Sequence, residues 1–255
     1  MDTQTAERLV ALNSDFYQNH FSSFSATRSQ PWQGWKQCLD ALEQEWTPLP
    51  TSCSVLDLAC GNLRFEVYLH DSLPSVDFDF HAVDNCDPLA QSATRDLDVH
   101  FQCCDLLEPL LSEQSPDPLG ETPRADLTVS FGFLHHIPGE QHRRKFLQSM
   151  LGHTAPGGLV MVSLWQFMND PARTQTVEAA NERALSHLGL PALDEGDFLL
   201  GWQARPNAYR YCHHFSSNEI DRLIGALSPQ GELVSRFSAD GKNNNMNTYL
   251  VFTRR

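Results

Sequence analysis

Apolar runs that end in an acidic residue recur three times in the first half of the chain. The first run ends at Asp57, the second at Asp84 and the third at Asp105. Each run has the length and character of a buried strand, and a turn of small residues after the first leads into a helix. Open α/β sheets bind ligands in the crevice outside the carboxyl ends of such strands. The pattern therefore predicts three carboxylates along one edge of one sheet, beside a ligand.

Helix-like and strand-like patterns alternate through most of the chain. Strands alternating with helices indicate a parallel sheet with helices on both faces. The predicted fold class is α/β, with a Rossmann-like, seven-stranded and mostly parallel sheet. Arg143, Arg144 and Lys145 are expected on a solvated helix face. Beyond the three acidic-ended runs, strands are expected at residues 125–131, 159–164, 231–237 and 248–252, a turn at 156–158, and helices at 9–21, 32–42, 139–152 and 218–227.

Two segments depart from this alternation. Residues 1–50 are expected to form an N-terminal helical segment ahead of the main domain, residues 51–255. Between residues 169 and 204 the alternation stops, and the apolar spacing predicts a single helix. We interpret residues 169–204 as a cap inserted after the fifth strand, over the carboxyl edge of the sheet.

Charge and composition narrow the classes of protein. The chain has 32 acidic against 18 basic residues and a net charge of -14. This balance disfavours a broad nucleic-acid surface, because neutralisation of phosphates dominates that kind of binding. No apolar run approaches the roughly 18 residues of a membrane span, and the first residues lack the features of a secretion signal. The cysteines form no CxxC pair, so we expect reduced thiols, no metal site, no membrane association and a cytoplasmic location.

The turn after the first run has the composition of a ligand-binding loop. Ala59 and Gly61 allow the backbone to approach a ligand, and the amides that open the next helix are free to donate hydrogen bonds. Asp84 follows at about the twenty-residue spacing at which an acid accepts hydrogen bonds from ribose hydroxyls. The alternative is that Asp84 and Asp105 only cap the helices that follow them.

This arrangement resembles the class I S-adenosylmethionine-dependent methyltransferases. The resemblance implies S-adenosyl-L-methionine as the cofactor, with its methionine part at the first turn, its ribose at the second acid and its adenine near the third. The cofactor-binding residues that it implies are Asp57, Ala59, Gly61, Asn62, Arg64, Asp84, Asp105, Leu106 and Leu134.

Four further stretches resemble the tRNA wobble-uridine methyltransferases, which esterify a carboxymethyl group on uridine. The resemblance implies a modified wobble uridine in tRNA as the methyl acceptor, and it leaves room for an activating protein subunit. Ala59 and Leu63 stand where this family usually has glycine. The four stretches are residues 24–32, 134–137, 156–165 and 210–215.

The acceptor chemistry suggests three catalytic candidates. A carboxylate acceptor is already ionised at neutral pH and needs an orienting cation rather than a base. Arginine presents a planar fork that matches a carboxylate, and Arg28 and Arg210 both lie in the family-like stretches. His135 could donate a hydrogen bond, or remove a proton from an acceptor nitrogen or hydroxyl, or simply pack. His213 and His214 are not expected to share a metal, because adjacent residues of a strand point to opposite faces.

Two other functions fit the same sequence. The chain could methylate a small-molecule acid or amine, with residues 169–204 as a closing lid. It could also be a non-catalytic subunit of a modification complex, because a fold does not fix a function.

Overall fold

The computed structural model describes residues 1–27, 30–86, 97–112, 117–203 and 205–255. Its centre is a seven-stranded sheet with the strand order β3-β2-β1-β4-β5-β9-β8. Strands β1 to β5 are parallel, and β9 runs antiparallel to both of its neighbours. The predicted α/β fold with a mostly parallel sheet is confirmed. The strands are β1 (Ser52–Leu58), β2 (Asp77–Asp84), β3 (Val99–Cys103), β4 (Ala125–Ser130), β5 (Thr154–Trp165), β8 (Gly231–Ala239) and β9 (Asn247–Arg254).

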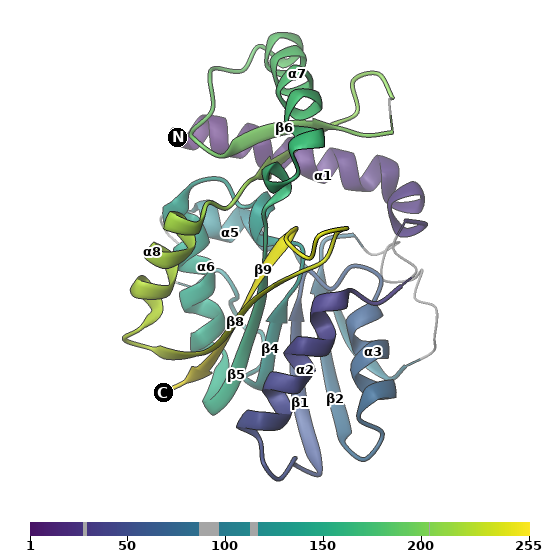
Figure 1. Cartoon of the computed structure of the whole chain (residues 1–255), viewed down its shortest axis with the longest axis vertical. Coiled ribbons are helices and arrows are strands. Elements are labelled where there is room, and N and C mark those ends of the chain that lie inside the picture. Colours follow the sequence, from purple (N-terminus) through teal and green to yellow (C-terminus); the bar gives the residue numbers. More distant parts are fainter. Residues whose placement is uncertain (28–29, 87–96, 113–116, 204) are drawn as a thin grey trace.

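Helices cover both faces of this sheet (Figure 1). Along β1, Val55 packs toward the helices of one face and Leu56 toward those of the other, as the two-residue period of a strand requires. The central strands are thereby buried on both sides, which explains why they are almost continuously apolar. One face carries α2 (Gln33–Glu45) and α3 (Arg64–Ser72), and the other carries α5 (Leu107–Leu111), α6 (Glu140–Gly152) and α8 (Ser217–Leu227).

A further layer lies over one end of the sheet (Figure 1). We call it the upper layer. In it α1 packs on β7, and α7 packs on β6. Strands β6 and β7 form a two-stranded antiparallel sheet of their own. The members of the upper layer are α1 (Thr3–Ser25), α7 (Pro171–Leu188), β6 (Asp197–Gly201) and β7 (Tyr209–His213).

The upper layer differs from the expected cap in two respects. The insertion after β5 contains a strand pair besides the predicted helix, and its second strand lies beyond residue 204. The N-terminal residues 1–50 are divided, because α1 joins the upper layer whereas α2 packs on the sheet. Across the described residues, no helix combines the length and apolar character that crossing a membrane requires.

The turn expected at residues 156–158 lies inside β5. Ala125 pairs with Thr154 and Leu127 with Leu159, so the pairing shifts across residues 155–158 as in a bulge. A Cβ on Gly158 would lie 2.5 Å from the carbonyl oxygen of Asp126, so only glycine fits this close approach. The sequence signal was correct, but the chain makes a bulge there and the strand continues.

Candidate active site

A cavity of about 250 Å³ lies between the sheet and the upper layer. Asp57 and Asp84 line it from the ends of β1 and β2, and Tyr17 and Arg210 line it from α1 and β7. It is next to the point between β1 and β4 where the strand order reverses, which is where open α/β sheets bind ligands. A ligand in this cavity would touch both layers of the molecule.

The turn that follows β1 approaches the cavity in a left-handed conformation. Ala59, Gly61 and Leu63 have φ values of 62°, 61° and 57°. The amides of Ala59 and Cys60 donate to the carbonyl of Val83 at 2.8 and 3.1 Å, which holds the turn against β2. Ala59 and Leu63, where glycine is usual in the family that the sequence resembles, thus adopt the conformation that glycine adopts most easily.

Asp84 joins this turn to the end of β2. One of its carboxylate oxygens accepts the N–H of Gly61 at 2.9 Å, and the other accepts the N–H of Cys86 at 2.8 Å. Burial raises the pKa of Asp84, although these amide contacts act in the opposite direction. Each oxygen keeps a lone pair, so the carboxylate can still accept hydrogen bonds from the hydroxyls of a ribose in the cavity.

Of three further residues predicted to bind the cofactor, two line the cavity and one does not. Asp105 lines the cavity, and its carboxylate accepts the N–H of Leu107 at 2.7 Å, in the first turn of α5. The capping role considered as the alternative for Asp105 is therefore present. Leu106 also lines the cavity. The side chain of Leu134 does not: it is fully buried in the core between the sheet and α6, and its predicted contact with the cofactor stays a prediction.

Asn62 and Arg64 attach the turn to the N-terminal part of the chain. The Nε of Arg64 donates to Asn62 Oδ1 at 3.0 Å, and its Nη1 donates to the carbonyl of Gln30 at 2.6 Å. The guanidinium lies over the rings of Trp32 and Trp35, and burial lowers the pKa of Arg64 to about 10. Both residues line the cavity, as predicted for cofactor-binding residues.

A second carboxyl group lies beside Asp57, and the sequence analysis missed it. Glu66, in the first turn of α3, is completely buried, and Asp57 is 3% exposed. Burial raises the pKa of Glu66 to about 7. Burial and the neighbouring Glu66 also raise the pKa of Asp57 well above its usual range. Glu66 could have been found from its position three residues before Leu69, on the buried face of the helix.

Arg210 is a buried cation surrounded by aromatic rings. Its guanidinium carbon lies 5.2 to 5.8 Å from the centres of four rings, and the residue is 7% exposed. Its Nε has no hydrogen-bond partner, and no acidic side chain of the described chain forms an ion pair with it. Arg28, the other arginine candidate, lies outside the described residues. The rings belong to Phe16, Phe24, Trp165 and Trp202.

Two histidines line the cavity close to Arg210. The ring of His135 lies 4.8 Å from Trp165 and 4.1 Å from His136 between ring centres. The Nδ1 of His136 lies 2.9 Å from the carbonyl oxygen of Tyr211 and 3.0 Å from Asn13 Nδ2, and its Nε2 lies 2.8 Å from the Tyr17 hydroxyl. Tyr17 lines the cavity, and the sequence analysis missed it because it gave the N-terminal helix no part in a site.

Asn13 fixes α1 on the strand that carries Arg210. Its Oδ1 accepts the N–H of Tyr211 at 2.7 Å, and its Nδ2 donates to the carbonyl of the same residue at 3.1 Å. The side chain thus takes the place of a neighbouring strand for one residue of β7. Asn13 was also missed, since nothing in the sequence indicates which strand a helix will contact.

Three residues with metal-binding side chains meet beside this site. The candidate ligand atoms of His135, His136 and Cys212 lie within 4.8 Å of one another. Both ring nitrogens of His136 are already engaged in hydrogen bonds. The expectation that the chain holds no metal stays a prediction.

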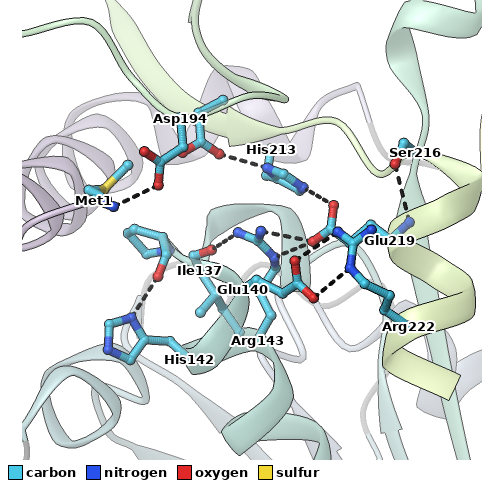
Figure 2. A network of polar contacts seen from close by, with 12 residues as sticks. Met1, Ile137, Glu140, His142, Arg143, Asp194, His213, Ser216, Glu219 and Arg222 are labelled. Carbon is cyan, nitrogen blue, oxygen red and sulfur yellow. Dashed lines mark hydrogen bonds and ion pairs between the residues drawn. The ribbon is translucent and has the colours of Figure 1, made fainter. Parts of the chain in front are cut away.

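A buried ionic network holds the end of β7 against α8 (Figure 2). The Nδ1 of His213 lies 2.6 Å from Asp197, and its Nε2 lies 2.6 Å from Glu219. The two ring nitrogens thus face two different carboxylates, one from β6 and one from α8. His214 points elsewhere and accepts the N–H of Met168 at 3.3 Å. As expected, the two adjacent histidines do not face a common ligand.

Arg143 completes the network from α6. It donates to Glu219 at 2.8 and 3.0 Å and to the carbonyl of Ile137 at 2.9 Å. Burial alone would raise the pKa of Glu219, but His213 and Arg143 more than offset it and lower that pKa. The prediction that Arg143 lies on a solvated helix face is wrong: the residue is 4% exposed. Its position becomes favourable only because α8 supplies the carboxylate.

Comparison with known proteins supports the fold at low sequence identity. No family model and no curated protein matches the chain. The chain is similar to 1,6-didemethyltoxoflavin-N1-methyltransferase from Burkholderia thailandensis, with a TM-score of 0.59, 15% identity, and coverage of 98% of this chain and 90% of that one. It is also similar to magnesium protoporphyrin IX methyltransferase from Synechocystis, with a TM-score of 0.55, 10% identity, and coverage of 95% and 97%. A third similar structure, a SAM-dependent methyltransferase from Methanosarcina mazei, gives a TM-score of 0.57, 14% identity, and coverage of 81% and 94%. The chain has the fold of class I S-adenosylmethionine-dependent methyltransferases.

Proposed function

We propose that this protein is an S-adenosylmethionine-dependent methyltransferase whose acceptor is a small molecule with a carboxylate group. The observation that carries the proposal is the position of Arg210. This buried cation, which has no acidic partner, lines the same cavity as Asp57 and Asp84 at the sheet edge. A buried charge without a counter-ion costs free energy, and an anionic ligand would remove that cost.

The residues at the sheet edge fit the proposed cofactor. Asp84 would accept hydrogen bonds from the ribose hydroxyls, and the turn at Gly61 leaves room for the backbone to approach the ligand. Arg64 offers a cation to the methionine carboxylate from its place on the cavity wall. Solved structures of similar fold contain S-adenosylmethionine or S-adenosylhomocysteine, which supports this choice of cofactor.

The surroundings of Arg210 suit the methylation of an anion. S-adenosylmethionine supplies an electrophilic methyl group when it is bound. Arg210 would hold the acceptor carboxylate in one orientation, and the surrounding rings would exclude water from it. Positioning of this kind can supply about 7–11 kcal/mol of an activation barrier. No general base is needed, because a carboxylate is ionised at neutral pH. For an amine acceptor, His135 would be the residue to remove the proton.

Two considerations favour a small acceptor over tRNA. Two of the similar proteins are named for small-molecule substrates, a didemethyltoxoflavin and magnesium protoporphyrin IX. The net charge of -14 also disfavours an extended phosphate-binding surface. A wobble-uridine acceptor and an activating subunit stay predictions from the sequence resemblance. Loss of a methyl-ester uridine from the tRNA of a deletion strain would support the tRNA acceptor over the small acid.

The proposal can be tested in two steps. First, isothermal titration calorimetry with S-adenosylhomocysteine should show binding at one site; without binding, the non-catalytic interpretation would be preferred. Second, a panel of carboxylic acids is incubated with S-adenosylmethionine, and formation of S-adenosylhomocysteine is followed by liquid chromatography. With an accepted acid, Arg210→Lys should lower turnover at least about tenfold, because the planar fork is lost. Arg144→Lys, on the exposed face of α6, is the matched control. Unchanged turnover in Arg210→Lys would remove this residue from the site.

A further inference from the structure

Tyr17 and Arg210 enter the cavity from two elements that are locked together. Asn13 bonds α1 to β7 at the residue directly after Arg210, and Tyr17 follows Asn13 by one turn on the same face of α1. The ring centre of Phe24 lies 4.9 Å from that of Tyr17 and 5.8 Å from the guanidinium carbon of Arg210. For Phe16 the same two distances are 5.2 and 5.4 Å. The phenol and the guanidinium therefore occupy the same stretch of the cavity wall.

His136 holds the hydroxyl of Tyr17 from behind. The Tyr17 oxygen lies 2.8 Å from His136 Nε2, and both residues line the cavity. At the other nitrogen of the ring, Nδ1 lies between two groups of opposite character. The carbonyl oxygen of Tyr211, an acceptor, is 2.9 Å away, and Asn13 Nδ2, a donor, is 3.0 Å away. The orientation of the Asn13 amide is fixed, because its Oδ1 accepts the N–H of Tyr211.

A neutral His136 ring can therefore adopt either tautomer at similar cost. With the proton on Nδ1, the ring donates to the Tyr211 carbonyl, but its N–H faces the N–H of Asn13. With the proton on Nε2, Nδ1 accepts from Asn13, but its lone pair faces the carbonyl oxygen. Each form thus makes one favourable and one unfavourable contact at Nδ1, and a ligand can decide between them.

The tautomer determines what Tyr17 presents to the cavity. With the proton of His136 on Nδ1, the Tyr17 O–H donates to Nε2, and the phenol oxygen can only accept from a ligand. With the proton on Nε2, His136 donates to the phenol oxygen, and the Tyr17 O–H can turn toward a ligand. An ionised carboxylate accepts hydrogen bonds and donates none. A carboxylate beside Arg210, whose Nε has no hydrogen-bond partner, is therefore bound by the second form.

We propose that Tyr17 is the second donor, beside Arg210, to the carboxylate of the methyl acceptor, and that His136 takes its Nε2–H tautomer to direct the Tyr17 hydrogen there. The inference rests on the proposed function and deepens it by naming the groups that hold the acceptor. In the reaction a carboxylate oxygen bonds to the methyl carbon, the carbon–sulfur bond breaks, and its electron pair stays on sulfur. No proton moves, so Tyr17 binds the acceptor without acting as a base, and His136 is a positioning residue.

The first test measures carboxylate binding to protein saturated with S-adenosylhomocysteine, with phenylacetate and benzoate as probes and calorimetry as the readout. Tyr17→Phe keeps the ring and removes only the hydroxyl. It should weaken probe binding about 10- to 100-fold, because a hydrogen bond to a charged group is lost. Its affinity for S-adenosylhomocysteine should stay within about twofold of the wild type. Tyr209→Phe is the matched control, because Tyr209 packs in an apolar cluster of the upper layer.

The outcomes of this test separate the inference from the proposed function. Equal probe binding by the wild type and Tyr17→Phe would overturn the inference alone. A loss of affinity for S-adenosylhomocysteine in Tyr17→Phe would assign Tyr17 to the cofactor and would also overturn it. Absence of probe binding by the wild type would overturn the carboxylate acceptor of the proposed function as well.

The second test asks whether His136 acts through Tyr17. His136→Leu should weaken probe binding about 3- to 10-fold, because the hydroxyl loses the group that orients it. In the Tyr17→Phe background the same substitution should have no further effect, since the two residues act as one unit. His136→Gln, whose amide can donate to the phenol oxygen, should restore binding to within about threefold of the wild type. Effects that multiply in the double variant would overturn the role of His136.

The third test reads the tautomer in the wild type and so needs no variant to fold. The ¹⁵N chemical shifts of the His136 ring show which nitrogen carries the proton. With phenylacetate bound to the protein loaded with S-adenosylhomocysteine, Nε2 should carry it. A proton on Nδ1 alone in that complex would overturn the proposal, because Tyr17 would then donate to the histidine and not to the carboxylate.

Discussion

Two buried arginines in this protein have opposite surroundings. Arg143 is 4% exposed and donates to Glu219, whereas Arg210 is 7% exposed, lies among four aromatic rings and has no acidic partner among the described residues. Removing one partner of a buried ion pair leaves an uncompensated charge, whereas removing an unpaired buried charge leaves none. Loss of Arg143 would therefore leave the buried charge of Glu219 uncompensated, whereas loss of Arg210 would leave no unpaired charge behind.

This contrast gives a prediction for a matched pair of variants. Arg143→Met should lower the free energy of unfolding by about 3–5 kcal/mol, because the buried Glu219 loses the cation that donates two hydrogen bonds to it. The loss in free energy of unfolding should be at least about 2 kcal/mol smaller for Arg210→Met than for Arg143→Met, since this substitution removes only the cation–π attraction to the rings. Urea denaturation of the ligand-free protein at pH 7.5 measures both. Equal losses would mean that Arg210 stabilises the folded chain through a partner other than the rings.

Glu66 should make the ligand-free protein less stable as the pH rises. Its pKa is about 7 in the folded protein against an ordinary value of 4.5, so the folded state holds the proton more tightly than the unfolded state. The stability that Glu66 contributes is full below pH 4.5 and is lost as the pH rises toward 7. The advantage of Glu66→Gln over wild type should therefore grow by about 2–3 kcal/mol between pH 5 and pH 8. Denaturation curves at both pH values check this, and a constant difference would contradict it.

At the scale of elements, β7 connects the site to the rest of the molecule. Asn13 bonds it to α1, and His213 bonds its end to both Asp197 and Glu219 (Figure 2). Arg210 lies on the same five-residue strand, directly before Tyr211, the residue that Asn13 contacts. The strand is short, so its position over the cavity depends on side chains more than on its own ladder of hydrogen bonds.

Substitution of adjacent histidines should show this dependence. His213→Ala would leave two buried carboxylates without the ring that contacts both, and we expect a loss of about 3–5 kcal/mol in the free energy of unfolding. His214→Ala should cost no more than about 1–2 kcal/mol, because that ring is only half-buried and accepts a single amide hydrogen bond. Thermal and urea denaturation at pH 7 compare the two. Similar losses in both variants would show that the network of Figure 2 contributes little to stability.

At the scale of the whole molecule, the cavity is shared by the sheet and the upper layer. Residues of α1, β7, β1 and β2 all line it, so a ligand there would bind the two layers together. At a concentration about 100 times its dissociation constant, S-adenosylhomocysteine should stabilise the fold by about 2.7 kcal/mol. That corresponds to a rise in Tm of about 5–10 °C for a chain of this size.

Hydrogen exchange would show whether both layers take part. With S-adenosylhomocysteine bound, amides of α1 and of the turn at residues 59–63 should both exchange more slowly. Methionine alone, which cannot reach the ribose site, serves as the negative control. Protection confined to the turn would mean that the ligand contacts the sheet without the upper layer.

The fold was predictable from the sequence because it follows from local patterns. The runs before Asp57 and Asp84 end as strands that expose both carboxylates to one cavity, as expected. The helical turn after β4 places the side chain of Leu134 in the core, which its sequence position did not indicate. Tyr17 and Asn13 could not be identified, since their roles depend on which distant element they face.

The sequence by itself determined the order of strands and helices in the main sheet domain and the three acids at the sheet edge, because the two-residue and 3.6-residue periods are set within a few neighbouring residues. Only the tertiary structure decided that α1 belongs over the cavity, that Arg143 is buried against Glu219 and that Arg210 lies unpaired among aromatic rings. These outcomes depend on contacts between residues far apart in the chain. Burial then alters the free energy of each charged side chain. Its surroundings, and not its residue type alone, therefore decide whether it pairs with a partner, keeps a proton or can bind a ligand.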